Sequence, residues 1–327
     1  MAENLLQIKD LYVEYRSDKG ILGKKQIIHA VNGVTLNIKK GEILAIAGES
    51  GCGKSTLAKA IMQLEKIKSG DILFKDKNIL KFNKEEMKNF HKNVQMVFQN
   101  PYSSLNPKMR IIDTLKEPLQ INTKLSKAET EKIVVEKIEL TGLDKNCLYL
   151  YPHEFSGGQR QRIAMARALV SEPEFILADE PLSALDVSIQ AQIINLLKEL
   201  KEKFNLTFLL ITHDMSVIKY LSDRVAIMYL GEIVEVGANF SIFHNPKHPY
   251  TKALLSAVPK FGKQTAKSLL KGDLPSPESL PSGCRFHTRC PHVMPICREN
   301  HPDIINLSSM HCVRCFLLDE RRCVRYK

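Results

Sequence analysis

The sequence has no apolar run long enough to cross a membrane. Its longest apolar stretches, such as Phe208–Ile211, fall far short of the roughly 18 residues that a membrane-spanning helix needs. The first residues, Met1–Asn4, lack the basic and apolar regions of a secretory signal. We therefore expect a chain that does not itself cross a bilayer and that stays in the cytosol.

No nucleic-acid-binding pattern is present either, although the formal net charge is +11. Such a charge suits a nucleic-acid partner, an anionic membrane surface or simply a dispersed basic surface. Because the lysines are spread along the chain, we expect a dispersed surface and no nucleic-acid partner. The 327 residues, 44% hydrophobic and 25% charged, are typical of a folded main domain with a smaller appended module.

Hydrophobic patterning predicts an α/β nucleotide-binding architecture. Apolar and polar positions alternate over residues 1–38, which favours antiparallel strands. Later apolar strands alternate with helices, the pattern of a parallel sheet with crossover helices, and a mostly helical stretch at 100–155 predicts an inserted helical subdomain. The buried strands are expected at 43–47, 175–178 and 207–211, and the crossover helices near 158–170 and 188–203.

A glycine-rich segment between an expected strand and an expected helix fits the phosphate-binding loop pattern. Its glycines let backbone N–H groups surround phosphate oxygens, Lys54 can reach the β- and γ-phosphates, and Ser55 can ligate Mg²⁺. Thr56 follows directly, and Cys52 is an ordinary variant residue of the loop. The loop consists of Gly48, Glu49, Ser50, Gly51, Cys52, Gly53, Lys54 and Ser55, and it predicts ATP binding with Mg²⁺.

A second chemical signal is the apolar strand Phe175–Ala178, which ends in two carboxylates. Asp179 can hold the magnesium shell, and Glu180 can orient and polarise an attacking water. Alone the signal is weak, because strand ends often carry acidic residues for solubility.

The segment Phe155–Gln159 opens another expected helix, and Ser156 alone could be an ordinary N-cap. These five residues resemble the signature sequence of ABC ATPases. The other stations of that family occur in its order along the chain: phosphate loop, glutamine loop, signature, acidic strand, D-loop and switch histidine. Gln99 matches the glutamine loop, Ser183–Asp186 the D-loop, and His213 the switch histidine.

The resemblance implies a P-loop NTPase of the ABC ATPase type, in which each ATP lies between two ATPase subunits. Glu180, His213 and Gln99 would then be catalytic, and Ser55, Gln99 and Asp179 would surround Mg²⁺. Further nucleotide contacts would come from Tyr15, which would stack on adenine, and from Thr56, Asp179, Ser156, Gly158, Gln159 and Asp186. The signature residues would contact the nucleotide bound by a homologous partner, so one copy alone should be a poor enzyme.

The segments Asn245–Leu255 and Asn100–Pro107 are similar to the His-Pro-Tyr extension and the glutamine loop of ATPases from peptide and nickel importers. Gly272–Pro277 and the insertion Lys19–Gly23 look more like the second ATPase of a dipeptide/oligopeptide importer than the first. The resemblance implies a heteromeric ATPase partner, two permease subunits, an extracytoplasmic peptide-binding protein and a peripheral position on the cytoplasmic membrane face. Alternatives are a nickel importer ATPase and a soluble ABC ATPase acting on DNA or ribosomes.

Six of the eight cysteines lie after residue 280, behind a linker rich in Pro and Ser. We expect an ATPase domain at 1–240, the extension and linker at 241–283, and a small Cys-rich module at 284–327. Such a cluster in a cytosolic chain suggests a metal or iron–sulfur site. Four thiolates suit a [4Fe–4S] cluster or zinc, and some members of the family carry a cluster here; free cysteines in a packed tail are the alternative. The expected ligands are Cys284, Cys290, Cys297 and Cys315, with Cys312 as a competing fourth ligand and Cys323 unassigned.

Overall fold

The computed structural model describes residues 3–17, 26–100, 104–183, 185–257 and 272–319. The chain divides into two compact units, which we describe separately. Of the described residues, the helical unit comprises those within 1–3, 39–43 and 78–211, and the β-rich unit comprises those within 4–38, 44–77 and 212–327. The predictions for Lys19–Gly23, Pro101–Ser103, Ala184 and Cys323 concern residues outside the described ranges.

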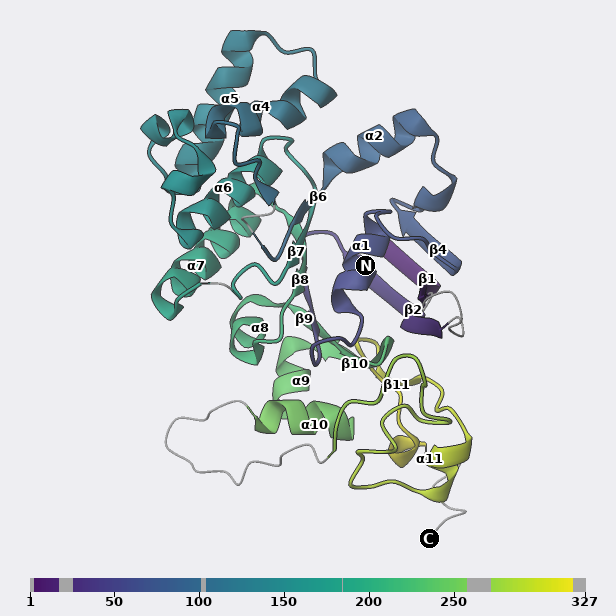
Figure 1. The fold of residues 1–327 in the computed structure, drawn as a ribbon. Helices are drawn as coiled ribbons and strands as arrows, with labels where there is room; N and C mark the ends of the chain where they lie inside the picture. The colour runs from purple at the N-terminus through teal and green to yellow at the C-terminus, as the bar shows by residue number, and fades with distance from the viewer. Residues whose placement is uncertain (1–2, 18–25, 101–103, 184, 258–271, 320–327) are drawn as a thin grey trace. The chain divides into compact units, whose positions relative to one another are not determined.

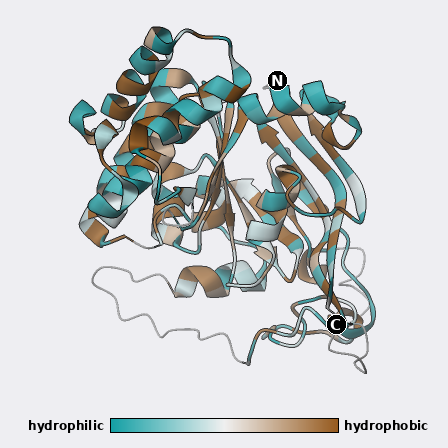
Figure 2. Ribbon diagram, turned by 45° about the horizontal axis from the view of Figure 1, so that its top comes forward, coloured by the Kyte–Doolittle hydropathy of each residue, from teal (hydrophilic) through white to brown (hydrophobic). Residues whose placement is uncertain are grey.

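The β-rich unit begins with an antiparallel sheet, as the alternation over residues 1–38 predicts. Its strands are β1 (Asn4–Ser17), β2 (Gln26–Lys39), β4 (Ser69–Phe74) and β5 (Lys77–Asn78), in the order β2-β1-β4-β5. β1 and β4 pair antiparallel, with Leu6 opposite Phe74. Buried side chains such as Leu11 and Val13 alternate with more exposed ones, and brown and teal bands follow the long strands in Figure 2.

The same unit contains a second run of hydrogen-bonded strands. Their order is β11 (Ile305–Ser308), β12 (His311–Val313), β10 (Glu232–Ala238), β9 (Arg224–Tyr229) and β3 (Ile43–Ala47). β3 and β9 are parallel, and β9, β10, β12 and β11 pair antiparallel in turn. The helices of the unit are α1 (Lys54–Ile61), α8 (Met215–Leu221), α9 (Asn239–His244), α10 (Pro249–Ser256), α11 (Pro295–Glu299) and the short η4 (Phe316–Leu318).

The C-terminal residues take part in this sheet. Val236 of β10 lies opposite Cys312 of β12, so a strand from the Cys-rich region extends the run of strands. A separate Cys-rich module is therefore not confirmed, whereas the α/β P-loop architecture is confirmed. The domain boundaries at 240 and 283 stay a prediction.

The helical unit combines three parallel strands with a group of helices. The strands are β6 (Val94–Val97), β7 (Phe175–Asp179) and β8 (Thr207–Ile211), in the order β8-β7-β6. The helices are α2 (Lys84–Asn93), α4 (Ile111–Asn122), α5 (Lys127–Leu140), α6 (Gly157–Leu169) and α7 (Val187–Phe204), with short η1 (Ile79–Lys81), η2 (Lys145–Tyr149) and η3 (Pro152–Glu154).

Helices α4, α5 and α6 form one packed group, as Figure 1 shows. Leu115, Ile138 and Ile163 are fully buried at its centre. Ser126 begins α5 with a reciprocal capping box to Glu129, which satisfies backbone N–H groups that the first turn leaves free. The helical subdomain expected between 100 and 155 is thus confirmed.

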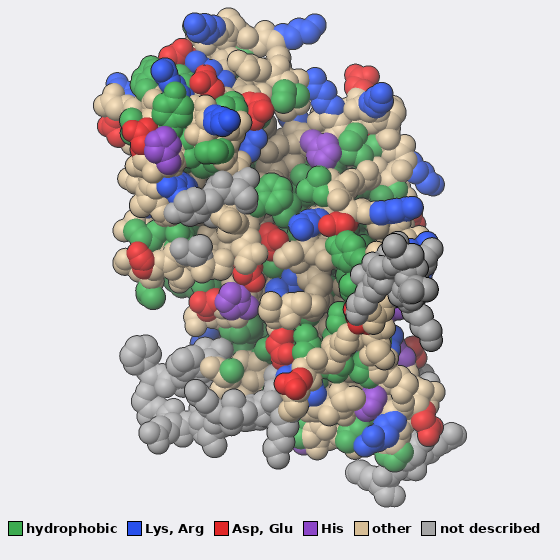
Figure 3. Space-filling view, viewed as in Figure 1, with side chains coloured by type: hydrophobic (Ala, Val, Ile, Leu, Met, Phe, Trp, Pro, Cys, Tyr) green, Lys and Arg blue, Asp and Glu red, His purple; other side chains and the backbone are tan. Residues whose placement is uncertain are grey.

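The surface carries interspersed charges. Figure 3 shows Lys and Arg scattered among Asp and Glu on the face it presents. This dispersal agrees with the expectation drawn from the lysine distribution. Among the described helices, none combines the length and the apolar character that a membrane span requires.

Candidate functional site

The phosphate-binding loop connects β3 to α1, as its pattern predicts. Gly53 begins α1 in the left-handed region at φ 104°, and a Cβ there would lie 2.1 Å from the carbonyl oxygen of Ala30. Only glycine fits this turn without displacing backbone. Lys54 is buried, and its Nζ donates to the carbonyl oxygens of Gly48 and Glu49 at 2.8 and 2.9 Å.

Cys52 packs inside this loop. Its side chain is 1% exposed, its Sγ lies 3.7 Å from Lys54 Nζ, and burial raises the pKa of its thiol. A buried protonated thiol has little nucleophilic character. Cys52 therefore acts as a small apolar packing residue in the loop.

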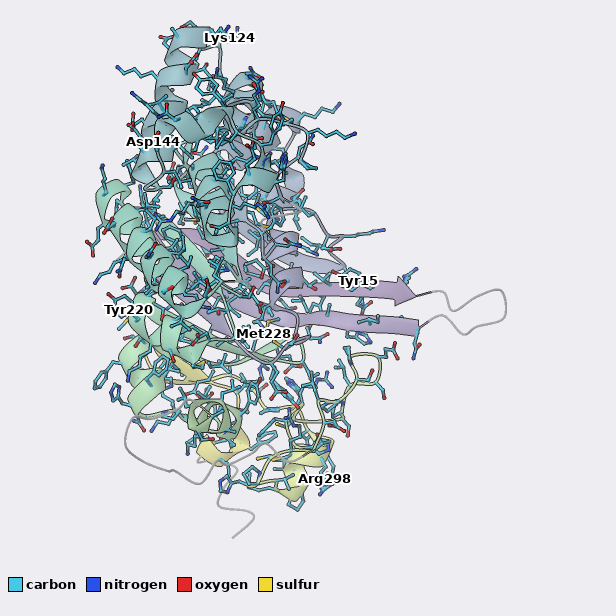
Figure 4. The ribbon with its side chains drawn as sticks, turned by 60° about the vertical axis from the view of Figure 1, so that its left-hand side comes forward. Tyr15, Lys124, Asp144, Tyr220, Met228 and Arg298 are labelled. Atoms are coloured by element: carbon cyan, nitrogen blue, oxygen red, sulfur yellow. The ribbon has the colours of Figure 1, made fainter. Side chains whose placement is uncertain are left out.

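Tyr15 lies near the end of β1 (Figure 4), and its side chain contacts the first turn of α1. Its hydroxyl lies 3.3 Å from Thr56 Oγ1, and burial raises its pKa. The ring thus stands beside the helix that follows the phosphate-binding loop. Stacking of Tyr15 on adenine stays a prediction.

The acidic strand β7 is buried along its whole length, and Asp179 is only 4% exposed. Glu180 follows with a left-handed φ of 45°, and its N–H donates to Ile211 O at 2.8 Å. Gln99 Nε2 donates to Glu180 Oε2 at 2.8 Å. The structure therefore brings two predicted catalytic residues, 81 residues apart in sequence, into direct contact.

The predicted signature residues form the N-terminus of α6. Ser156 caps the helix: Gln159 N–H donates to Ser156 Oγ at 3.3 Å, and Ser156 N–H donates to Gln159 Oε1 at 3.0 Å. Ser156 and Gln159 are exposed, whereas Gly158 is buried, and a Cβ on Gly158 would lie 2.4 Å from Ile189 Cγ2. An exposed helix N-terminus suits an anionic ligand, because the helix dipole is positive there.

The D-loop turns directly after Glu180. Ser183 Oγ donates to Glu180 O at 3.1 Å, and exposed Asp186 stands at the start of α7.

In the β-rich unit, His213 is exposed just before α8, which Asp214 caps through Ser216 N–H at 2.7 Å. The role of His213 as the switch histidine stays a prediction.

Two contacts to the loop were not predicted. Tyr250 and Arg289, from the extension and the Cys-rich region, both bind Glu49. The His-Pro-Tyr pattern draws attention to Tyr250 in the sequence, but nothing local links either residue to a loop more than 200 positions earlier.

The four predicted cysteine ligands lie in one small packed region. Cys284 and Cys297 pack with Phe316, and Cys284 N–H donates to Cys297 O at 2.9 Å. Burial raises the pKa of Cys284 and of Cys315 to about 12, and repulsion among these thiols adds to the shift. Nevertheless, among the described residues no three His, Cys, Asp or Glu side chains are grouped to hold a metal ion.

Metal binding by these cysteines is therefore not supported by the geometry of the described residues. Cys312, considered as a competing fourth ligand, donates instead to Asn306 Oδ1 at 2.9 Å. The chemistry of the four thiols fits a thiolate-bound centre, but their placement does not form an ion site.

Two families match the sequence: ABC transporter over residues 31–183, and the oligopeptide/dipeptide transporter C-terminal region over residues 234–297. The chain is 47% identical over 321 residues to the oligopeptide transport ATP-binding protein AppF of Bacillus subtilis, covering 96% of this chain and 98% of that protein. It is 45% identical to Escherichia coli OppF, an oligopeptide transport ATP-binding protein, with 96% of each covered. It is 44% identical to the dipeptide transport ATP-binding protein DppF of Haemophilus influenzae, covering 96% of this chain and 97% of that protein.

Solved structures agree on the fold. The dimeric post-hydrolysis structure of the ATP-binding cassette MJ0796 bound to ADP and Pi superposes with a TM-score of 0.64 at 30% identity, covering 72% of this chain and 98% of that chain. The cbiO1 structure from Clostridium perfringens, part of the ABC transporter complex cbiONQ, gives a TM-score of 0.63 at 29% identity, covering 74% and 92%.

Proposed function

Because this chain belongs to the ABC transporter family of peptide transport ATP-binding proteins, we propose that it hydrolyses ATP to power the import of oligopeptides or dipeptides. The observation that carries this proposal is the match along 96% of the chain to peptide transport ATPases, including the peptide-transporter region at 234–297. The relatives named above are all peptide transport proteins, so nickel import and a non-transport role are not favoured.

The geometry of each site residue supports a role in the reaction. Lys54, at the start of α1, would neutralise the β- and γ-phosphates, and Glu180 would orient and polarise the attacking water. Gln99 holds Glu180 through its 2.8 Å hydrogen bond and so fixes the direction of that carboxylate. His213 would sense the γ-phosphate.

We propose that Mg²⁺ accompanies the bound ATP. The Ser55 hydroxyl of the β-rich unit and the buried Asp179 carboxylate of the helical unit are each of a ligand type that Mg²⁺ prefers. When bound, the ion supplies neutralisation of charge that develops on the transferred phosphoryl group. Gln99 and Asp179 would stand close to its shell.

The substitution Glu180→Gln tests the assignment. It keeps the size and the oxygen acceptor for Gln99 but removes the base, and general-base catalysis contributes about 10²–10⁴ in rate. We expect ATP turnover in the assembled transporter to fall about a hundredfold or more while ATP affinity changes less than about threefold. Glu172→Gln is the matched control, because Glu172 is 77% exposed and pairs only with Lys137 in the salt bridges described. Near-normal turnover in Glu180→Gln would remove Glu180 from its role.

We also propose that the active form pairs this chain with a homologous ATPase. The exposed Ser156 and the helix N-terminus behind it would contact ATP on the partner's loop, and the similar MJ0796 cassette is described as a dimer. Two permease subunits and an extracytoplasmic peptide-binding protein would complete the assembly at the cytoplasmic membrane face. Co-purification with the permeases, and loss of the chain from membranes lacking them, tests this arrangement.

A [4Fe–4S] cluster on Cys284, Cys290, Cys297 and Cys315 is the finer proposal for the Cys-rich region, with Zn²⁺ as the alternative. Support comes from Cys315, whose pKa is raised by burial and, in smaller part, by the nearby Cys284, Cys290 and Cys297. Iron, sulfide and zinc analysis of anaerobically purified protein tests the choice.

A further inference from the structure

Glu49, the second residue of the phosphate-binding loop, is held by two residues from the C-terminal third of the chain. Arg289 Nη1 lies 2.9 and 3.2 Å from the two carboxylate oxygens of Glu49. The Tyr250 hydroxyl accepts a hydrogen bond from Glu49 N–H at 2.9 Å. The side chain and the main chain of one loop residue are therefore each fixed by a partner, 240 and 201 residues away in sequence.

Both partners are anchored in a buried aromatic cluster. Tyr250 is fully buried, and only 6% of the Arg289 side chain is exposed. The rings of Tyr229, Tyr250 and Phe286 pack with centroids 4.7 to 5.4 Å apart, and the Arg289 guanidinium lies 6.0 Å from the Tyr229 centroid. Aromatic pairs and a cation over a ring each restrict the orientation of the side chains involved. Arg289 and Tyr250 are therefore held in fixed positions next to Glu49.

The start of α10 places Tyr250 through a further set of hydrogen bonds. Glu235 of β10 accepts from the N–H groups of Lys247 and His248 at 2.8 and 2.9 Å. His248 Nδ1 then accepts from Tyr250 N–H at 3.1 Å. The Glu235 side chain is 0% exposed and also binds His311 at 2.8 Å. Since Glu235 lies on β10, its hydrogen bonds hold the His-Pro-Tyr segment against the sheet.

Glu49 connects these supports to the phosphate-binding machinery. Its carbonyl oxygen accepts from Lys54 Nζ at 2.9 Å, while its N–H is bound by Tyr250. A displacement of this one residue would therefore move both the lysine and the adjoining loop backbone. In addition, a carboxylate beside a phosphate site repels the phosphates, and the Arg289 guanidinium offsets that charge.

We infer that Arg289 and Tyr250 are positioning residues for ATP: acting through Glu49, they hold the phosphate-binding loop in shape and neutralise its carboxylate. The C-terminal region thereby sets nucleotide affinity, a role beyond fastening itself to the fold. The inference rests on the proposed ATPase function. It predicts that removing Arg289 weakens ATP binding and that removing the Glu49 charge as well restores part of it.

The test is calorimetric titration of the full-length chain and its variants with MgATP, together with their thermal midpoints. Loss of a charge-assisted hydrogen bond corresponds to roughly tenfold or more in affinity, so we expect Arg289→Gln to weaken MgATP binding about tenfold. Tyr250→Phe, which removes only the hydroxyl, should weaken it about threefold to tenfold. In Glu49→Gln/Arg289→Gln most of the lost affinity should return, because no unpaired carboxylate remains.

Arg285→Gln is the matched control. Arg285 lies in the same region and pairs at 3.0 Å with Glu232, a residue outside the loop. Its substitution should leave MgATP affinity within about twofold of wild type. If Arg289→Gln and Tyr250→Phe both bind MgATP as wild type does, the inference is wrong, whatever their thermal midpoints.

The same variants also cover two other outcomes of the titrations. If Arg289→Gln fails to fold, then Arg289→Lys, which keeps the charge but loses the two-oxygen contact, and Tyr250→Phe carry the decision. If the wild-type chain binds no MgATP, the proposed ATPase function itself fails. A double variant that binds no better than Arg289→Gln alone contradicts the charge-neutralising part of the inference.

Discussion

His248 makes the stability of this chain sensitive to acid. It is fully buried at the start of α10, with its ring 5.6 Å from Phe286, and burial lowers its pKa from 6.5 to about 3. The folded imidazole is therefore neutral and accepts from Tyr250 N–H, although the Glu235 carboxylate binds the His248 N–H nearby. In the unfolded chain the His248 imidazole becomes protonated below pH 6.5, whereas in the folded chain it stays neutral until about pH 3.

The sign and size of the effect follow from this difference. Between pH 6.5 and 3 the unfolded state binds more protons than the folded state. Burial of the neutral His248 ring therefore costs no stability from protonation above pH 6.5, and the free energy of unfolding decreases as the pH falls from 6.5 towards 3. Each pH unit is worth about 1.4 kcal/mol, so by pH 4.5 this one residue lowers the free energy of unfolding by about 2 to 3 kcal/mol.

The substitution His248→Asn isolates that contribution. Asparagine is a good N-cap and its oxygen can accept from Tyr250 N–H, but it does not titrate. Urea unfolding of both proteins at pH 7.0, 5.5 and 4.5 gives the free energy of unfolding at each pH. The variant is expected to be less stable at pH 7.0, where the ring leaves a void, and to lose about 2 to 3 kcal/mol less than wild type on going to pH 4.5. Parallel pH dependences would refute the reasoning.

Three other predictions concern the candidate sites. Gly53→Ala places a methyl group 2.1 Å from Ala30 O and should abolish measurable MgATP binding, whereas Gly51→Ala, with open space around its Cβ, should weaken binding less; equal losses in titration would contradict this. Gly158→Ala crowds Ile189 at 2.4 Å, and we expect it to retain MgATP binding by the isolated chain but to lower turnover in the assembled transporter at least tenfold; full turnover would argue against a signature role. The proposed cluster predicts about four irons and four sulfides per chain in anaerobically purified protein, as a cubane on four thiolates requires; stoichiometric zinc without sulfide would make the region a structural zinc site, and protein without either metal would contradict the proposal.

The parts of the fold that follow local chemistry could be predicted from the sequence. The alternation in β1, the strand-loop-helix around Lys54 and the capping of α6 by Ser156 each depend on residues a few positions apart. The expected helices at 158–170 and 188–203 match α6 and α7 to within one residue.

The remaining features depend on contacts between distant residues. No local pattern indicates that Val236 pairs with Cys312, because β12 is a strand of only three residues. The contact of Gln99 with Glu180 depends on β6 and β7 lying side by side in register. The Arg289–Glu49 pair spans 240 residues, and its strength comes from aromatic burial that no single motif encodes.

The most direct test of the account is reconstitution of the chain in liposomes with the permeases, the peptide-binding protein and the homologous ATPase that we propose as its partner. Uptake of a labelled peptide is measured with ATP on the cytoplasmic side. We expect uptake that requires both ATP and the peptide-binding protein and that Glu180→Gln in this chain strongly reduces. Uptake that continues without this chain, or ATP hydrolysis that peptide and binding protein leave unchanged, would contradict the claim that it powers peptide import.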